Sequence, residues 1–187
     1  MPLTHSLYGH RLALHTGRMT QISVRPVQPG DGFTCAQAWM DAGRYYTSLD
    51  KANFQIPTED GLAEWFENLN AHTEPDELVL VGCIDDHVAG FVAAHLSRPD
   101  ADAHRQLARH LSVSNVIVNA LVVAENHRRA GVGSALMLEV ERWAREQGAH
   151  VISLDTNIHS PLSVSFYENR MNYTRSAFIF RKSLQPE

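Results

Sequence analysis

Between an apolar run and a helical pattern, the sequence reads Arg128-Arg129-Ala130-Gly131-Val132-Gly133-Ser134. The run before it, residues 116–123, is almost continuously apolar and β-branched, which is typical of a central strand buried on both faces. The segment after it stops at Gly148, as helices commonly do, and its apolar residues recur at helical spacing: Leu136, Val140, Trp143 and Ala144. This order predicts a strand, a glycine turn and a helix in succession.

The glycine turn is a candidate phosphate-binding site. Backbone N–H groups at the start of a helix can bind phosphate oxygens, and the helix dipole favours negative charge there. Arg128 and Arg129 precede the glycines in a chain whose formal net charge is −5, so the turn is basic against an acidic background. A simple connecting turn with solvated arginines is the plainer alternative, because two glycines alone are a weak signal.

A dinucleotide-binding fold is a further alternative for this turn. Asp155 ends the next predicted strand about 20 residues on, where a ribose-binding acid belongs. That fingerprint, however, has a third glycine where Leu136 stands. Its first glycine also directly follows the strand, whereas here residues 125–130 separate the strand from Gly131. The Gly-Lys-Ser/Thr sequence of a P-loop is also missing. Both nucleotide motifs therefore match poorly.

Composition indicates one globular domain. The chain has 187 residues, of which 44% are hydrophobic and 20% charged. We expect residues 21–187 to form a single domain with a sizeable core, preceded by a loose extension over residues 1–20. The negative net charge provides no basic field for nucleic acid or for an anionic membrane surface, so we expect no partner of either kind.

Cysteine and histidine spacing favours a cytoplasmic protein without a metal. Cys35 and Cys83 are far apart, which leaves no disulfide framework or cysteine-based zinc site. His5, His10 and His15 recur every five residues, a spacing that suits no helical metal pair. No apolar run reaches the roughly 18 residues of a membrane helix, and no signal-peptide core is present.

The remaining periodicity predicts alternating strands and helices. We expect a mixed aromatic and polar segment at 44–50, a short helix or loop at 98–112, and Ala177–Phe180 within a closing strand. Two helices are expected with core faces formed by Phe33, Ala36, Trp39 and Met40 and by Leu62, Trp65, Phe66 and Leu69. Further strands are expected at 22–27, 78–84, 87–96 and 151–155, and a last helix at 161–170, with 78–84 and 87–96 forming a hairpin.

The turn also resembles the acyl-CoA signature of the Gcn5-related N-acetyltransferase superfamily. Its R/Q-x-x-G-x-G/A pattern is matched by Arg128, Gly131 and Gly133 after the predicted strand. A second block of that family is similar to Leu154-Asp155, Ser160, Ser163, Phe166-Tyr167-Glu168 and Asn172-Tyr173, so the resemblance covers about residues 22–184. Ser160 and Ser163 replace the usual Asn and Ala. Asn172-Tyr173 replaces Gly-Phe, and asparagine tolerates the left-handed conformation that glycine would adopt there.

This resemblance implies an α/β fold with a mixed, largely antiparallel sheet, whose two parallel strands splay at an acyl-CoA site flanked by helices. Acetyl-CoA is the implied cosubstrate, with its pyrophosphate on the N–H groups of residues 129–134 and its pantetheine beside 121–123. Val123 is the expected bulge, and Ser160 or Asn157 would replace the family's asparagine. The implied cofactor-binding residues are Leu121, Val122, Val123, Arg128, Arg129, Ala130, Gly131, Val132, Gly133, Ser134, Asn157 and Ser160.

The chemistry of amine acetylation adds two candidate catalytic residues. An alkyl amine is mostly protonated at pH 7, and its neutral form costs about 4.6 kcal/mol, so a base is needed directly or through water. Asp155 lies where some members of the family carry a working carboxylate, although it could equally be a polar strand end. Tyr167 resembles the family's general acid, but the transfer of a proton from a phenol to a thiolate costs about 2 kcal/mol. Core packing is its alternative role, and Asn119 is a candidate to orient water or substrate.

The expected activity is transfer of an acetyl group from acetyl-CoA to a primary amine by direct attack. A non-catalytic acyl-CoA sensor is the main alternative, and it would need neither Tyr167 nor Asp155. A dinucleotide-dependent oxidoreductase is a distant third. The acceptor, a small-molecule or peptide amine, is left open, as is a homodimer. Tyr45, Tyr46 and Phe54 lie where the family's substrate-side helices occur and either line the acceptor pocket or pack.

Overall fold

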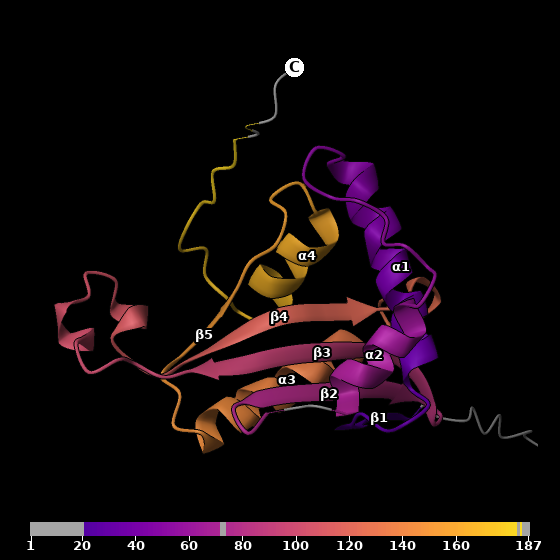
Figure 1. Ribbon diagram of the computed structural model, residues 1–187, viewed down its shortest axis with the longest axis horizontal. Helices are drawn as coiled ribbons and strands as arrows, with labels where there is room; N and C mark the ends of the chain where they lie inside the picture. Colours follow the sequence, from indigo (N-terminus) through magenta and orange to yellow (C-terminus); the bar gives the residue numbers. More distant parts are fainter. Residues whose placement is uncertain (1–20, 72–73, 183, 185–187) are drawn as a thin grey trace, which may run out of the picture.

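The computed structural model describes residues 21–71, 74–182 and 184 and contains a five-stranded sheet in the order β1-β2-β3-β4-β5 (Figure 1). The expected extension over residues 1–20, with His5, His10 and His15, lies outside the described residues. The strands are β1 (Ile22–Pro26), β2 (Glu77–Ile84), β3 (His87–Ser97), β4 (Asn115–Val123) and β5 (Val151–Leu154). The helices are α1 (Gly32–Leu49), α2 (Leu62–Ala71), α3 (Val132–Glu146) and α4 (Pro161–Ser165), and a π-helical turn (Phe166–Arg170) follows α4.

The sheet is antiparallel except at one pair. β4 and β5 run parallel, whereas β1–β2, β2–β3 and β3–β4 are antiparallel. This arrangement confirms the expected mixed, largely antiparallel α/β fold. It also removes the dinucleotide-binding alternative, because that fold requires a mostly parallel sheet with crossover connections.

Helices cover both faces of the sheet and enclose two apolar clusters (Figure 1). On one face, α3 buries Leu136, Met137 and Val140 against the strands. On the other face, α1 and α2 enclose Phe66 and Phe91, whose rings lie 5.2 Å apart in an edge-to-face arrangement. The expected core face of α3 is therefore confirmed.

Helix α1 differs from its expected form in length and in one core residue. The mixed segment 44–50 continues the helix as far as Leu49 instead of leaving it. Tyr45 and Tyr46 make hydrogen bonds to the α4 region, and these tertiary contacts fix the last turn in helical form. Phe33, expected in the core, is 63% exposed, because it lies on the outer side of α1, whereas Cys35 and Ala36 of the same turn face the apolar cluster.

Helix α2 contributes less to the core than its pattern suggests. Phe66 is 5% exposed, but Trp65 and Leu69 remain about half exposed. Trp65 instead packs edge-to-face on Phe66 at 4.9 Å between ring centroids. Of the expected core face of α2, Phe66 is therefore the residue that is fully buried.

Strand β4 contains a bulge, but not at the expected residue. Ala93 pairs with Ala120 and Ala94 pairs with Val118, so Asn119 has no partner across the ladder, whereas Val123 pairs regularly with Gly90. Asn119 is also exposed, so the strand is not buried on both faces. An extra residue of this kind reverses which face the following side chains occupy.

Of two segments outside the main elements, one agrees with expectation and the other does not. Residues 98–112 form two short 3₁₀ turns, Ala103–Arg105 and Arg109–Leu111, as the polar composition allowed. The closing strand expected around Ala177–Phe180 is wrong, since this segment is extended but pairs with no strand. Phe180 is 94% exposed, which shows that β-type composition alone does not provide a pairing partner.

Gly90 is expected to be required for the close pairing of β3 with β4. A Cβ atom at this position would lie 2.4 Å from the carbonyl oxygen of Val122, which is backbone and cannot move aside. Gly90→Ala should therefore lower the free energy of unfolding by about 1–3 kcal/mol in urea denaturation. Gly133→Ala is the control, because its Cβ would make ordinary contacts from 3.5 Å, and its stability should be unchanged or slightly higher. Equal stability of the two variants would contradict this role.

Candidate active site

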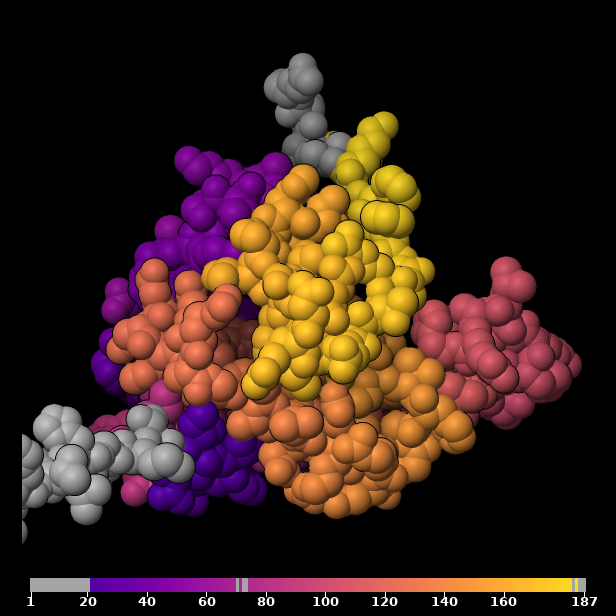
Figure 2. All heavy atoms as spheres, turned by 180° about the vertical axis from the view of Figure 1, so that it is seen from behind, coloured from indigo at the N-terminus to yellow at the C-terminus, as the bar shows by residue number. Residues whose placement is uncertain are grey.

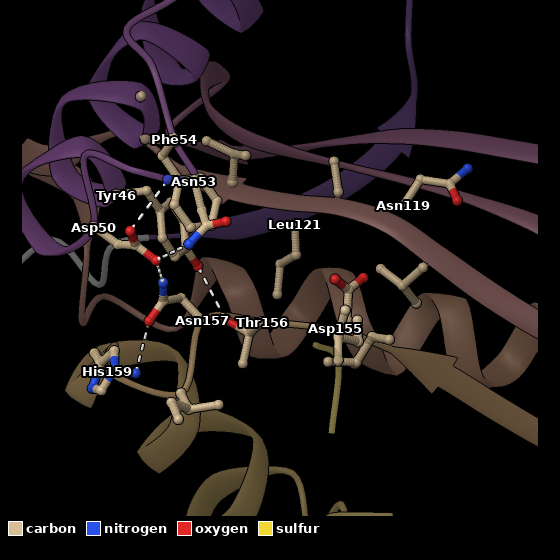
Figure 3. A pocket seen from close by; sticks show the side chains of 18 of the residues that line it. Tyr46, Asp50, Asn53, Phe54, Asn119, Leu121, Asp155, Thr156, Asn157 and His159 are labelled. Atoms are coloured by element: carbon tan, nitrogen blue, oxygen red, sulfur yellow. Dashed lines mark hydrogen bonds between the residues drawn. The ribbon is translucent and has the colours of Figure 1, made fainter. Parts of the chain in front are cut away.

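A cavity of about 540 Å³ opens where β4 and β5 separate. Pairing between these strands ends at Val118 and Leu154, while β4 continues for five more residues to Val123. The backbone groups on that edge of residues 119–123 therefore have no strand beside them in the described part of the chain. Residues of β4, the segment after β5, the end of α1 and Tyr167 line the cavity (Figure 3). The expected splay of the two parallel strands is present.

The glycine turn carries a run of unused N–H groups; it does not line the cavity itself but follows β4, whose residues 118–122 do. Among the described residues, the N–H groups of 129–134 donate no backbone hydrogen bond, and the first bond of α3 runs from Ala135 N to Gly131 O at 3.0 Å. Arg129 and Gly131 both have positive φ, 67° and 101°. Alternating backbone conformations of this kind direct successive N–H groups into one concavity, which suits an anion.

The side chains of the turn divide into exposed and structural ones. Arg129 and Ala130 are exposed, whereas Val132, the first residue of α3, is buried in the core and Ser134 accepts a bond from Arg170 at 3.4 Å. Arg128 turns back toward the sheet instead, as its guanidinium lies 5.3 Å from the Tyr45 ring centroid and its Nε donates to the Val123 carbonyl at 3.4 Å. In this structure Arg128 joins the turn to α1 and β4.

Tyr167 lines the cavity from the π-helical turn. Its ring packs edge-to-face on Phe166 at 5.1 Å and on Tyr173 at 6.0 Å, so it also belongs to the core. Burial, chiefly, raises the pKa of the Tyr167 hydroxyl, and the nearby Tyr46, Tyr173 and Asp155 act in the same direction. The hydroxyl makes no hydrogen bond to a described residue and stays protonated, so it can donate one to a ligand.

Asp155 directly follows β5 and faces the cavity. Its carboxylate points toward β4 near Leu121 (Figure 3), and it is exposed. Within the described part of the chain it accepts no hydrogen bond and forms no ion pair. Asp155 therefore stands at the end of the strand, as its alternative role would have it, but its carboxylate has no contact among the described residues that would give it a structural function.

Asp50 is a second carboxylate that lines the cavity, but its oxygens already accept hydrogen bonds from neighbouring residues. At the end of α1 it accepts bonds from the Asn53 side chain at 2.8 Å, from the Asn53 backbone at 3.2 Å and from Asn157 at 3.2 Å. The Asn53 side chain is the main cause of the lowered pKa of Asp50. Asp50 therefore fastens α1 to the loop after β5 (Figure 3).

Asn157 and Ser160, the two candidates to replace the family's asparagine, are both engaged in protein contacts. Asn157 lines the cavity, and its Oδ1 accepts a bond from the His159 N–H at 2.7 Å. Ser160 is fully buried and does not line the cavity; its Oγ accepts from Ser163 N at 3.1 Å and lies 3.0 Å from the Tyr45 hydroxyl. This geometry favours Ser160 as the N-cap of α4 and leaves Asn157 nearer to a ligand.

The sequence indicated only some of the residues that line the cavity on the side of α1. Tyr46 and Phe54 both line the cavity and pack on each other, with ring centroids 5.0 Å apart. The Tyr46 hydroxyl also lies 2.8 Å from Ser163 Oγ and 3.2 Å from Thr156 Oγ1. Asp50, Asn53 and Thr156 were missed. The Asp-x-x-Asn spacing at 50–53 is typical of an Asx turn and was the one available signal.

Asn119 lies at the opposite end of the cavity from Asp50 (Figure 3). Its Oδ1 is 3.1 Å from His95 Nδ1 on β3. Because an amide oxygen only accepts, the histidine nitrogen is the donor of this bond. His95 therefore supplies a hydrogen-bond partner for the Asn119 side chain.

Metal-binding clusters and membrane-spanning helices are both absent from residues 21–71, 74–182 and 184. No group of three or more His, Cys, Asp or Glu side chains that could hold a metal ion occurs there. No helix in these ranges has the length and apolarity to span a membrane. Cys35 and Cys83 are buried and free, and burial raises the pKa of the Cys35 thiol to about 12, so that thiol is not a nucleophile.

Comparison with known proteins identifies the family. Residues 41–173 match the model of the "Acetyltransferase (GNAT) family". The chain belongs to this family. A curated relative, the "Uncharacterized N-acetyltransferase YhdJ" of Bacillus subtilis (strain 168), is 22% identical over 128 residues, which cover 68% of this chain and 84% of that protein.

Solved structures share the fold at low sequence identity. A mutant of the BH1408 protein from Bacillus halodurans has a TM-score of 0.72 at 16% identity, covering 87% of this chain and 99% of that one. A putative acetyl transferase from Pyrococcus furiosus has a TM-score of 0.59 at 24% identity, covering 88% and 100%. The aminoglycoside N-acetyltransferase AAC(6')-Iy, solved in complex with CoA, has a TM-score of 0.57 at 16% identity, covering 90% and 99%.

Proposed function

We propose that this protein transfers an acetyl group from acetyl-CoA to a primary amine by direct attack of the amine on the thioester. The observation that carries this proposal is the cavity at the separation of β4 and β5, together with the unused N–H groups of residues 129–134 in the turn that follows β4. Tyr167 and Asp155 line the same cavity. Membership of the acetyltransferase family and the CoA complex of a protein with this fold support the proposal.

Two features of the chain suit acetyl-CoA. The concavity at residues 129–134 offers N–H donors to the pyrophosphate at the positive end of α3. The open edge of β4 at 119–123 offers backbone donors and acceptors to the amide groups of pantetheine, much as a sheet edge receives an added strand. Acetyl-CoA would supply the acetyl group as a thioester, with CoA thiol as the leaving group.

The reaction needs two proton movements, and one residue is available for each. The amine forms the new C–N bond as the C–S bond breaks, so the nitrogen loses a proton and the sulfur gains one. Asp155, exposed at the cavity and without a partner among the described residues, would take the amine proton directly or through water. Tyr167 would donate a hydrogen bond to the departing sulfur, because its hydroxyl stays protonated.

The direct test combines binding with turnover. The full chain is mixed with acetyl-CoA and a panel of primary amines, and release of free thiol is followed, with acetylated product identified by mass. We expect amine-dependent thiol release and a higher melting temperature with CoA. A rise in melting temperature without thiol release from any amine would favour the non-catalytic sensor. Stabilisation by NAD but not by CoA would contradict an acyl-CoA site.

Substitution in the turn should abolish stabilisation by CoA. CoA at 100 times its dissociation constant should add about 2.7 kcal/mol to the free energy of unfolding. Gly131→Val should lose this gain, but φ of 101° also strains valine there. Gly133→Val is therefore the cleaner variant, since its Cβ meets nothing closer than 3.5 Å, while its methyl groups obstruct the approach to the N–H groups. Full protection of a folded Gly133→Val by CoA would place the phosphate site elsewhere.

A further inference from the structure

A second hollow of about 360 Å³ adjoins the cavity, and Leu154 and Asp155 line both. We call it the distal groove; beyond the junction it is lined by residues of the segment 97–113, including Asp100 and Leu111, and by Asn115, Ile117 and Ser153. Its outer wall is the segment 97–113, which projects from the sheet as a separate lobe (Figure 2). Asp155 therefore stands where the cavity and the distal groove meet.

The cavity and the distal groove lie on the same face of the sheet. Val116 and Val118 pack into the cluster under α3, so Ile117 between them faces the opposite side. The bulge at Asn119 reverses the alternation, and beyond it Val122 faces α1. One face thus carries α1 over the cavity at one end and the 97–113 lobe beside the distal groove at the other (Figure 1).

The floor of the distal groove carries an amide donor without a protein partner. Asn115 is 4% exposed, and its Oδ1 accepts a hydrogen bond from Ser153 Oγ at 3.1 Å. Its Nδ2 makes no hydrogen bond to a described residue. This nitrogen is not fully buried, since Thr47 Oγ1 is the one fully buried side-chain nitrogen or oxygen without a partner in the described residues. The Asn115 nitrogen is therefore open to the groove and available to a carbonyl oxygen.

The other walls combine apolar surface with carboxylates. Leu111 and Ile117 supply apolar surface, and the charge of Arg98 is compensated by Asp76 at 2.8 Å. Asp100 and Asp155 also line the groove and form no ion pair among the described residues, so a ligand there can carry a cationic group as well. Amide and hydroxyl groups between apolar walls match a ligand that alternates hydrogen-bonding and apolar parts. A peptide backbone with small side chains has this alternation.

We propose that the acceptor is a peptide that lies across this face of the sheet. Its reacting amine would be in the cavity beside Asp155, and the next residues of the peptide would lie in the distal groove, with a backbone carbonyl on Asn115. This proposal rests on the proposed function, because the cavity fixes where the amine reacts. It assigns the 97–113 lobe to acceptor selection.

Acceptor length is the measurement that tests it. Alaninamide and the C-terminally amidated di-, tri- and pentapeptides of alanine present the same reacting amine and differ only in the length of chain attached to it. We expect kcat/KM to rise by about 10-fold or more from alaninamide to the pentapeptide, as one or two added contacts would give. A flat series would overturn the peptide proposal, while transfer to short amines would still support the proposed function.

Substitutions test whether the rise of kcat/KM with peptide length comes from the distal groove. Leu111→Asp and Ile117→Trp, which change its wall and its floor, should remove the length dependence and leave alaninamide turnover and CoA protection unchanged. Leu107→Asp is the matched control, because Leu107 is 102% exposed on the same segment and does not line the groove. If kcat/KM still rose with peptide length in the Ile117→Trp variant, the proposal would be overturned. Absence of transfer to any amine would contradict the proposed function itself.

Discussion

Replacing Tyr167 by phenylalanine is expected to lower turnover by about 10- to 10⁴-fold while acetyl-CoA binding changes little. The ring contacts with Phe166 and Tyr173 survive this change, and only the hydroxyl at the cavity is lost. Steady-state kcat and the stabilisation of the fold by CoA are the two measurements. A packing role alone predicts the opposite pattern, with lower stability and unchanged turnover in the folded enzyme.

The raised pKa of Tyr167 also determines which kind of help it gives. A phenol of ordinary pKa loses about 2 kcal/mol in giving its proton to a thiolate, and burial makes the Tyr167 proton still harder to remove. Hydrogen-bond donation to the leaving sulfur is therefore favoured over full proton transfer. Since the pKa is raised, the donor form persists as pH rises, and turnover should show no alkaline loss from Tyr167 below about pH 10.

Tyr173→Phe is the matched control for this experiment. Tyr173 lies beside Tyr167, but its hydroxyl donates to Glu141 at 3.4 Å and does not line the cavity. Its loss should affect stability without a large change in kcat. If both variants lost turnover equally, the effect would come from packing around the π-helical turn.

Local signals made most of the fold predictable. The β2–β3 hairpin follows from two apolar runs joined by Asp85-Asp86, which both adopt positive φ as a tight hairpin turn requires. Helix α3 is flanked by two glycines with positive φ, Gly131 directly before it and Gly148 two residues after its end. Each of these features depends on residues that are neighbours in sequence.

Features that depend on distant contacts were the ones misjudged. The last turn of α1 is held by hydroxyl contacts between residues about 115 positions apart, as in Tyr45 and Ser160. The bulge lies at Asn119 and not at Val123, because the register with β3 decides it. Strand-like composition at 177–180 could not show whether a partner strand would be present.

The site divides in the same way. The N–H groups of residues 129–134 were predictable because a glycine turn before a helix exposes them. Asp50 and Asn157 were not recognised as a pair, since 107 positions separate them in the chain. The distal groove required both the bulge and the position of the 97–113 lobe, and neither is visible in the sequence.

Asp155 can be tested with little disturbance of the fold. Asp155→Asn keeps the shape of the side chain, and because the carboxylate has no hydrogen bond or ion pair among the described residues, stability should change little. Asp50→Asn is the contrasting control, since the Asp50 carboxylate accepts bonds from Asn53 and Asn157 that an amide only partly replaces. That variant should lose stability while the shape of its pH–turnover profile is retained.

If Asp155 removes the acceptor's proton, Asp155→Asn should lose turnover by about 10²-fold near pH 7, within the usual range for a general base. The loss should shrink as pH rises, because a larger share of the acceptor amine is then already neutral and needs no base. Initial rates of thiol release from pH 6 to pH 10, at saturating acetyl-CoA, measure both effects. A profile that is lowered by the same factor at every pH, or not lowered at all, would assign proton removal to water and leave Asp155 as a wall residue shared by the cavity and the distal groove.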